Sequence, residues 1–139
     1  MTKLQRVYDF MQGAGYYFLL TVDENGYPKG RAFTSKILVD GKLYLATGKE
    51  KHVFQQLKAN PHIEIMAYQL KNQQYMRVDA TAVIDTQAEI VKQYLDKEPR
   101  AKDDFDGDAE SHLGMFYLSN AKAEILTLDG TVKETFSCE

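Results

Sequence analysis

Residues 30–54 read GRAFTSKILVDGKLYLATGKEKHVF and decide what kind of fold the chain adopts. Two apolar and β-branched runs flank the pair Asp40-Gly41, which supplies the positive φ values of a tight hairpin turn. We therefore expect a strand over residues 29–39 and its antiparallel partner over residues 43–47. A helix is expected next, over residues 49–59, because apolar side chains recur there at helical spacing.

The same two patterns continue along the rest of the chain. Alternating apolar and aromatic runs predict more strands, and amphipathic segments predict more helices. The strands are expected at residues 16–22, 63–68, 75–85, 115–118, 123–128 and 132–136, and the helices at residues 2–12 and 87–97. Consecutive hairpins with a few interposed helices favour a closed or nearly closed antiparallel barrel, in a mainly β fold with peripheral helices. No linker interrupts the pattern, so residues 1–139 are expected to form one domain.

Net charge, cysteine content and the lengths of the apolar stretches limit the partners and the compartment that we expect for the protein. A net charge of −3 over 139 residues argues against a protein whose main partner is nucleic acid. The single cysteine, Cys138, excludes an internal disulfide and fits a reducing cytoplasm. No apolar stretch approaches membrane-spanning length. We therefore expect a cytoplasmic protein with neither a membrane nor a nucleic-acid partner.

The hairpin and the helix after it carry three groups that bind anions. Arg31 lies on the first strand, Thr47 ends the second, and Lys51 lies in the first turn of the helix. A helix N-terminus offers unpaired backbone N–H groups and the positive end of the helix dipole. Together with the two charges and the hydroxyl, it predicts a site for the phosphate of a small ligand.

The spacing of Arg31 and Lys36 sets a condition on this site. The two residues are an odd number of positions apart, so a regular strand directs their side chains to opposite faces of the sheet. Both serve one ligand only if the strand is bulged or if one of them faces a subunit boundary. The sequence alone leaves that choice open.

An ordered series of motifs runs through the same region. They are Pro28-x-x-Arg31-x-Phe33, Asp40-Gly41-Lys42-Leu43-Tyr44-x-x-Thr47, Lys51-x-Val53, Leu57-x-x-Asn60-Pro61 and Met76-Arg77-Val78. With the elements between them, they resemble the pyridoxamine 5'-phosphate oxidase-like FMN-binding split-barrel family over residues 16–83. The tail over residues 116–136 is similar to the short bacterial branch near the nitroimidazole-resistance proteins.

The resemblance implies a six-stranded antiparallel split β-barrel that forms a twofold homodimer with FMN at the subunit interface. It also implies a phosphate and ribityl end, a stretch along the flavin, a position near the substrate and a contribution from the second subunit. The residues implied for the phosphate and ribityl end are Arg31, Thr47 and Lys51, and those implied along the flavin are Phe33, Thr34 and Ala46. Lys36 is implied near the substrate, and Gln74 and Tyr75 are implied as the contribution of the second subunit.

One departure from the family bears on activity. Pyridoxamine phosphate oxidases carry an Arg-Pro-Arg-x-Ser-Gln-like stretch and a Trp- and Arg-rich C-terminal signature. Here Glu98-Pro99-Arg100 is not followed by Ser-Gln, and the chain has no Trp. The flavin site survives this comparison, whereas the vitamin-oxidase activity does not.

We therefore expect an FMN-dependent oxidoreductase that acts on a small molecule through hydride or electron transfer, with no assigned catalytic side chain. Two alternatives stay open. One is a flavin-binding or redox- and stress-sensing module without turnover, and the other is a relative that uses deazaflavin or haem. No metal is expected, because the acidic residues 103–110 lack the spacing of an EF-hand and His52, His62 and His112 are scattered.

Overall fold

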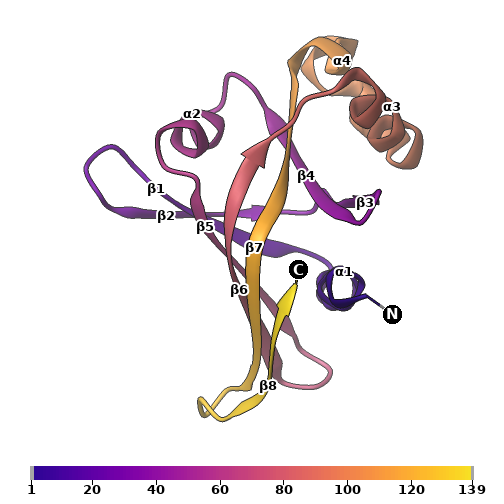
Figure 1. Cartoon of the computed structure of the whole chain (residues 1–139). Helices are drawn as coiled ribbons and strands as arrows, with labels where there is room; N and C mark the ends of the chain where they lie inside the picture. The colour runs from indigo at the N-terminus through magenta and orange to yellow at the C-terminus, as the bar shows by residue number, and fades with distance from the viewer. Residues whose placement is uncertain (1, 139) are drawn as a thin grey trace.

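The computed structural model describes residues 2–138 and shows a curved antiparallel sheet flanked by helices (Figure 1). Within these residues there are eight strands and four α-helices. The helices are α1 (Lys3–Ala14), α2 (His52–Ala59), α3 (Ala88–Lys97) and α4 (Ala109–His112). The strands are β1 (Tyr17–Val22), β2 (Pro28–Phe33), β3 (Ile37–Val39), β4 (Lys42–Gly48), β5 (His62–Gln69), β6 (Gln74–Ile84), β7 (Leu113–Thr127) and β8 (Val132–Cys138). Two short 3-10 helices, Pro99–Asp103 and Phe105–Gly107, connect α3 to α4.

Local sequence signals explain where the first elements begin and end. The Thr2 hydroxyl caps α1 by accepting a hydrogen bond from the Gln5 backbone N–H at 3.1 Å. Gly15 ends the helix with a φ of 90°. In the β1–β2 turn, the Asp23 carboxylate accepts hydrogen bonds from two backbone N–H groups, each at 2.9 Å.

The order of the strands nearly closes the sheet into a barrel. Along the sheet the strands run β2-β1-β5-β6-β7-β4-β3, and β8 pairs with β7 beside this path. The two ends of the path, β2 and β3, are consecutive in the chain and are joined only by residues 34–36. We call this three-residue connection the seam, because it links the two edges of the sheet.

The described residues form two cores, one on each side of the sheet. The larger core fills the barrel and includes the fully buried Tyr17, Leu45 and Phe116. The smaller core lies where α3 and α4 pack on β3, β4 and the start of β7, and it includes Tyr94 and Met115. The helical arm, which runs from α3 through the two 3-10 helices to α4, therefore packs on the barrel beside β3 and β4. Figure 1 shows α3 and α4 at the upper right.

The structure confirms the mainly β antiparallel barrel with peripheral helices and corrects several details. The strand count is eight rather than six. The strand expected over residues 29–39 is divided at the seam into β2 and β3. The strands expected at 115–118 and 123–128 are one continuous β7, because Asn120 absorbs a register shift with a φ of 52°. The helix expected from residue 49 begins three residues later, at His52.

No helix within residues 2–138 is long and apolar enough to cross a membrane.

Candidate functional site

The seam is held to strands on both of its sides by one buried residue, Ser35. The Ser35 hydroxyl donates to the Ala46 carbonyl at 2.9 Å and accepts from the Ala46 N–H at 3.0 Å, which ties the seam to β4. The Ser35 carbonyl accepts a hydrogen bond from the Tyr17 hydroxyl at 2.5 Å, which ties it to β1. Burial strongly raises the pKa of Tyr17, so this phenol stays protonated and remains a donor. These bonds interrupt the strand at residues 34–36.

Beside the seam lies a cleft of about 220 Å³, which we call the seam cleft. Its walls come from the end of β2, the seam, the end of β4, the start of α2 and the helical arm. The lining residues are Ala32, Phe33, Thr34, Ser35, Ala46, Thr47, Gly48, Lys51, Tyr94, Ala101, Asp104, Phe105 and Leu113. Five residues named from the sequence therefore meet in one cleft: Phe33, Thr34, Ala46, Thr47 and Lys51.

One end of the seam cleft has the composition of an anion site. Thr47 is buried at the end of β4, and Lys51 is the N-cap residue of α2 without a side-chain capping hydrogen bond. The Phe54 N–H donates to the Lys51 carbonyl at 3.1 Å. The N–H groups of His52 and Val53, ahead of it in the first turn of α2, have no intrahelical carbonyl within reach and lie at the positive end of the helix dipole. This end therefore combines one positive charge, one hydroxyl and the N-terminus of a helix.

Arg31 lies near this end but is not among the residues that line the cleft. Its Nη1 donates to Thr21 Oγ1 at 2.7 Å, and its Nη2 donates to Gln56 Oε1 at 3.1 Å. These bonds connect β2 to β1 and to α2. Partial burial lowers the pKa of Arg31, but an arginine remains charged at neutral pH. In this structure Arg31 therefore supports the position of α2.

Lys36 is buried on the other side of the seam, away from the cleft lining. Its Nζ donates to the Thr34 carbonyl at 3.3 Å and lies 5.7 Å from the ring centre of Tyr8. Lys97 donates to the Tyr8 hydroxyl as well. Burial lowers the pKa of Lys36. The break at the seam thus places Arg31 and Lys36 in different surroundings. Of the segment from Arg31 to Lys36, the residues that line the cleft are the four between these two, residues 32–35.

Gln74 and Tyr75 are not brought to the seam cleft of their own chain. They begin β6, next to the hairpin turn that joins it to β5, and pair with Thr127 and Leu126 of β7. Figure 1 shows this hairpin at the end of the barrel opposite the helical arm.

The lining residues that the sequence did not single out include Tyr94, Asp104 and Phe105. Burial, with Glu98 and Asp104 nearby, raises the pKa of Tyr94 to about 12, so its hydroxyl keeps its proton at neutral pH. The helical periodicity placed Tyr94 on the apolar face of α3, but only the docking of α3 on β3 and β4 brings it to the seam. No local pattern identifies Phe105, which reaches the cleft from a 3-10 helix.

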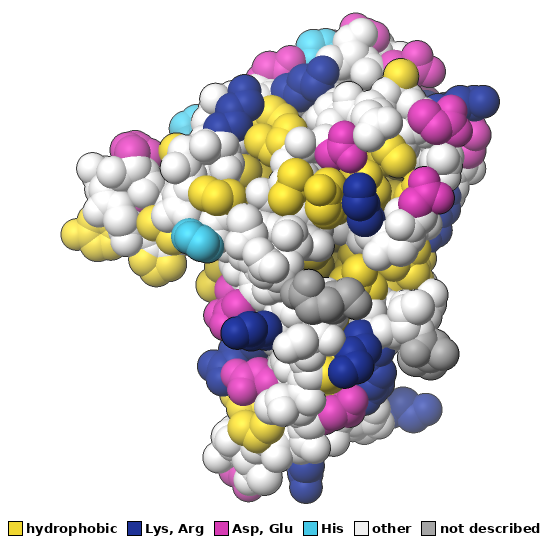
Figure 2. All heavy atoms as spheres, viewed as in Figure 1, with side chains coloured by type: hydrophobic (Ala, Val, Ile, Leu, Met, Phe, Trp, Pro, Cys, Tyr) yellow, Lys and Arg dark blue, Asp and Glu magenta, His cyan; other side chains and the backbone are white. Residues whose placement is uncertain are grey.

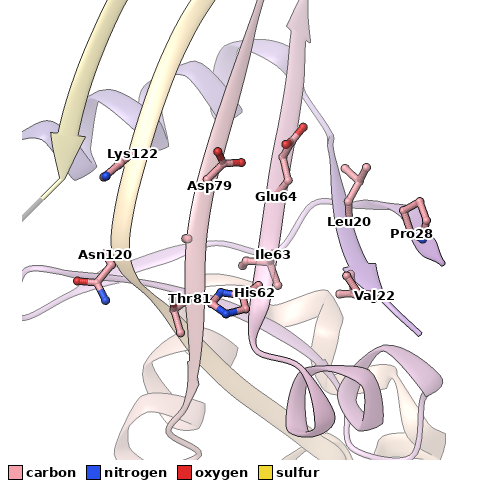
Figure 3. A pocket seen from close by; sticks show the side chains of 12 residues that line it. Leu20, Val22, Pro28, His62, Ile63, Glu64, Asp79, Thr81, Asn120 and Lys122 are labelled. Atoms are coloured by element: carbon pink, nitrogen blue, oxygen red, sulfur yellow. The ribbon is translucent and has the colours of Figure 1, made fainter. Parts of the chain in front are cut away.

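A second concavity, of about 620 Å³, lies on the outer face of the sheet (Figure 3). Apolar side chains of β1, including Leu20 and Val22, border it, and polar side chains of β5, β6 and β7 occupy its centre. Glu64 and Asp79 are cross-strand partners there, and Lys122 is the partner of Asp79 on the next strand. Burial and the Asp79 carboxyl raise the pKa of Glu64.

The same outer face exposes aromatic side chains. Tyr16, just before β1, and Phe18, near its start, pack edge to face and remain 54% and 39% exposed. Tyr27 is 65% exposed in the hairpin that projects to the left in Figures 1 and 2, where the space-filling view shows hydrophobic side chains at its surface. Exposed apolar clusters of this kind are typical of protein–protein contact surfaces.

Within residues 2–138, the side chains of His, Cys, Asp and Glu form no group of three or more that could hold a metal ion. The donor set at the Lys51 end of the seam cleft suits an anionic organic ligand.

Comparison with known proteins agrees with this geometry. The model of a family described as pyridoxamine 5'-phosphate oxidase matches residues 4–113. No curated protein matches the chain. A NimC/NimA family protein from Clostridium acetobutylicum is similar in structure, with a TM-score of 0.85 and 27% identity over 96% of this chain and 90% of that chain.

Two further solved structures share the fold at lower identity. A pyridoxamine 5'-phosphate oxidase-related, FMN binding protein from Nostoc punctiforme has a TM-score of 0.69 and 16% identity, over 91% of this chain and 84% of that chain. A heme binding protein from Mycobacterium smegmatis has a TM-score of 0.66 and 15% identity, over 92% of this chain and 54% of that chain. These similarities show the antiparallel split-barrel fold.

Proposed function

The chain belongs to the pyridoxamine 5'-phosphate oxidase family, and from this premise we propose that it binds FMN in the seam cleft and acts as an FMN-dependent oxidoreductase on a small molecule. The observation that carries the proposal is the meeting of Thr47, Lys51 and the N-terminus of α2 at one end of the seam cleft. A phosphate monoester fits such a donor set, since a cation and free N–H groups neutralise and hydrogen-bond its oxygens.

The rest of the cleft suits the larger, flatter part of a flavin. Phe33, Ala46 and Leu113 present apolar surface, and the Tyr94 hydroxyl and the seam present hydrogen-bonding groups. Lys51 and Thr47 would hold the phosphate, and Phe33, Thr34 and Ala46 would lie along the ring system. Bound FMN supplies the hydride or electron transfer, so the protein needs no acid–base pair of its own.

We further propose that the protein works as a homodimer whose two cofactor sites lie at the subunit interface. The exposed aromatic residues Tyr16 and Phe18 and the concavity of Figure 3 give the outer sheet face the character of a contact surface. Gln74 and Tyr75 lie far from their own seam cleft, and they are the residues that a second copy would contribute to it.

The haem alternative has less support from the residues. Haem iron is usually held by a His, Cys, Met or Tyr side chain. None of the three histidines lines the seam cleft, and Tyr94 is the one lining side chain of these four types. The M. smegmatis likeness therefore supports a shared fold rather than a shared ligand.

The absorption spectrum of the purified protein tests the proposal. We expect flavin bands, and release of FMN on denaturation, identified by mass. Anaerobic loss of the flavin absorbance on adding NAD(P)H, with recovery on adding a nitro or quinone acceptor, would support turnover. A protein that binds FMN but is not reduced would be a flavin-binding module. A protein that binds no FMN after reconstitution would contradict the proposal.

A further inference from the structure

The Phe105 ring lines the end of the seam cleft at which we place the phosphate. Gly48, which lines this end, leaves no room for a side chain, because a Cβ there would lie 2.9 Å from Phe105 Cε1 and 3.4 Å from Lys51 Cγ. The ring is therefore in close contact with the backbone of Gly48 and lies beside the stem of Lys51. It stands directly next to the N-terminus of α2.

The same ring also packs on His112. The two rings are stacked, with centres 5.5 Å apart and planes 20° from parallel. His112 is fixed in turn, because its Nδ1 lies 2.6 Å from Glu50 Oε1 and its backbone carbonyl accepts from the Lys49 N–H at 2.8 Å. Phe105 thus contacts both the backbone of Gly48 and an anchored His112.

The backbone also adopts an uncommon conformation to hold the ring there. Phe105 and Asp106 both have a φ of 58°, in the left-handed region that non-glycine residues seldom occupy. Two adjacent residues of this kind persist only where surrounding contacts over-determine them. The contacts of the Phe105 ring are such contacts, so its place is a defined feature of the fold.

Beyond the ring the surface is negatively charged. Glu50 and Asp108 lie on either side of His112, with Asp108 Oδ2 3.6 Å from His112 Nε2. The hydrogen bond with His112 lowers the pKa of Glu50, so its carboxylate stays ionised at neutral pH. A ligand that continued past the α2 N-terminus would meet first an aromatic ring and then carboxylates.

We propose that Phe105 is a specificity-determining residue that limits the cleft to ligands ending in one phosphate and excludes flavin dinucleotides. The inference rests on the proposed function, since it assumes that the flavin phosphate lies at the Lys51 end. FMN ends at its phosphate. FAD continues into a second phosphate and an adenosine, which need the space that the ring fills and bring negative charge toward Glu50.

The test compares the dissociation constants of FMN, FAD and riboflavin for the full-length protein and its Phe105→Ala variant, by fluorescence titration. We expect FAD affinity to rise at least about tenfold in the variant, with FMN affinity changed less than about threefold. Phe136→Ala, which shortens a half-buried aromatic residue that packs on the barrel core, is the matched control. It should leave the ratio of FAD to FMN affinity unchanged.

Phe105→Leu provides a second variant in case the alanine variant folds poorly, and it should give an intermediate gain in FAD affinity. Glu50→Gln should add a smaller gain that disappears at high salt, because it removes only charge. An unchanged affinity ratio in folded Phe105 variants that bind FMN overturns the inference alone. Failure of the unaltered protein to bind FMN overturns the proposed function and the inference with it.

Discussion

The hydroxyl of Ser35 and the backbone of Ala46 exchange two hydrogen bonds, one in each direction, at 2.9 and 3.0 Å. These two hydrogen bonds join the seam to β4, and both Ser35 and Ala46 line the cleft. A buried hydroxyl that satisfies both a backbone N–H and a carbonyl is costly to remove, because both groups lose their partner.

Replacement of Ser35 by Ala should therefore lower the free energy of unfolding by about 1–3 kcal/mol, measured by urea denaturation. Ser111→Ala, which removes an exposed hydroxyl bonded to Asp108, is the control and should cost little. An equal loss of unfolding free energy in the two variants would show that the Ser35 bonds stabilise the fold no more than an exposed hydroxyl does.

Lys51→Ala should weaken FMN binding by roughly ten- to a hundredfold, the loss of about 1.5–3 kcal/mol expected for a charged hydrogen bond to phosphate. Riboflavin affinity should not change, because riboflavin has no phosphate. Lys58→Ala, in the last turn of the same helix, is the matched control. The site assignment fails if Lys51→Ala and Lys58→Ala bind FMN equally well.

Arg31→Ala should act differently from Lys51→Ala. Because Arg31 bonds Thr21 and Gln56, its loss should weaken FMN binding and also lower the stability of the cofactor-free protein by about 1–2 kcal/mol. The Lys51→Ala variant should leave the stability of the cofactor-free protein unchanged, because the Lys51 side chain makes no capping hydrogen bond. Thermal unfolding of both apo variants measures the contrast, and equal melting temperatures would contradict it.

A shared site predicts complementation between two damaged chains. Lys51→Ala and Tyr75→Ala subunits should each bind FMN poorly, whereas their verified heterodimer should regain one site per dimer. A heterodimer of Lys51→Ala with Arg31→Ala is the control. It should not recover, because each of its sites keeps one damaged phosphate end. Recovery in neither mixture, or a monomer at micromolar concentration, would contradict the shared site.

The raised pKa of Glu64 predicts a pH dependence. A native pKa above the unfolded value means that the native state binds this proton more tightly, so the contribution is present at acidic pH and is lost as the pH rises through the native pKa. Glu64→Gln should therefore stabilise the protein at pH 7 relative to the unaltered chain, and the advantage should vanish near pH 4. Exposed Glu89→Gln is the control, and parallel melting profiles for both variants would contradict the prediction.

The sequence predicted the parts of the fold that depend on neighbours along the chain. The Asp40-Gly41 turn and the approach of Thr47 to Lys51 follow from local patterns, because a hairpin strand and the helix after it place these residues close together. The break at the seam was not predicted, since the buried Ser35 bonds that cause it involve β1 and β4.

The walls of the cleft that come from the helical arm could not be predicted from the sequence either. Tyr94 reaches the cleft only because α3 packs on β3 and β4, and Phe105 only because its backbone takes a left-handed conformation. Both depend on tertiary packing that no periodicity records. The Glu64 and Asp79 pair was likewise hidden, because it depends on the register of β5 against β6.

The seam, which joins β2 to β3, has a consequence for aggregation. Unpaired edge strands are templates on which other chains add. Here β3, at one end of the strand order, has three residues, and β2, at the other end, begins with Pro28, which has no backbone N–H. Because the seam holds these two edges together, a change that frees it would uncover both at once. We therefore expect variants that disrupt the seam to fail through association into larger particles before they unfold, and light scattering would detect this.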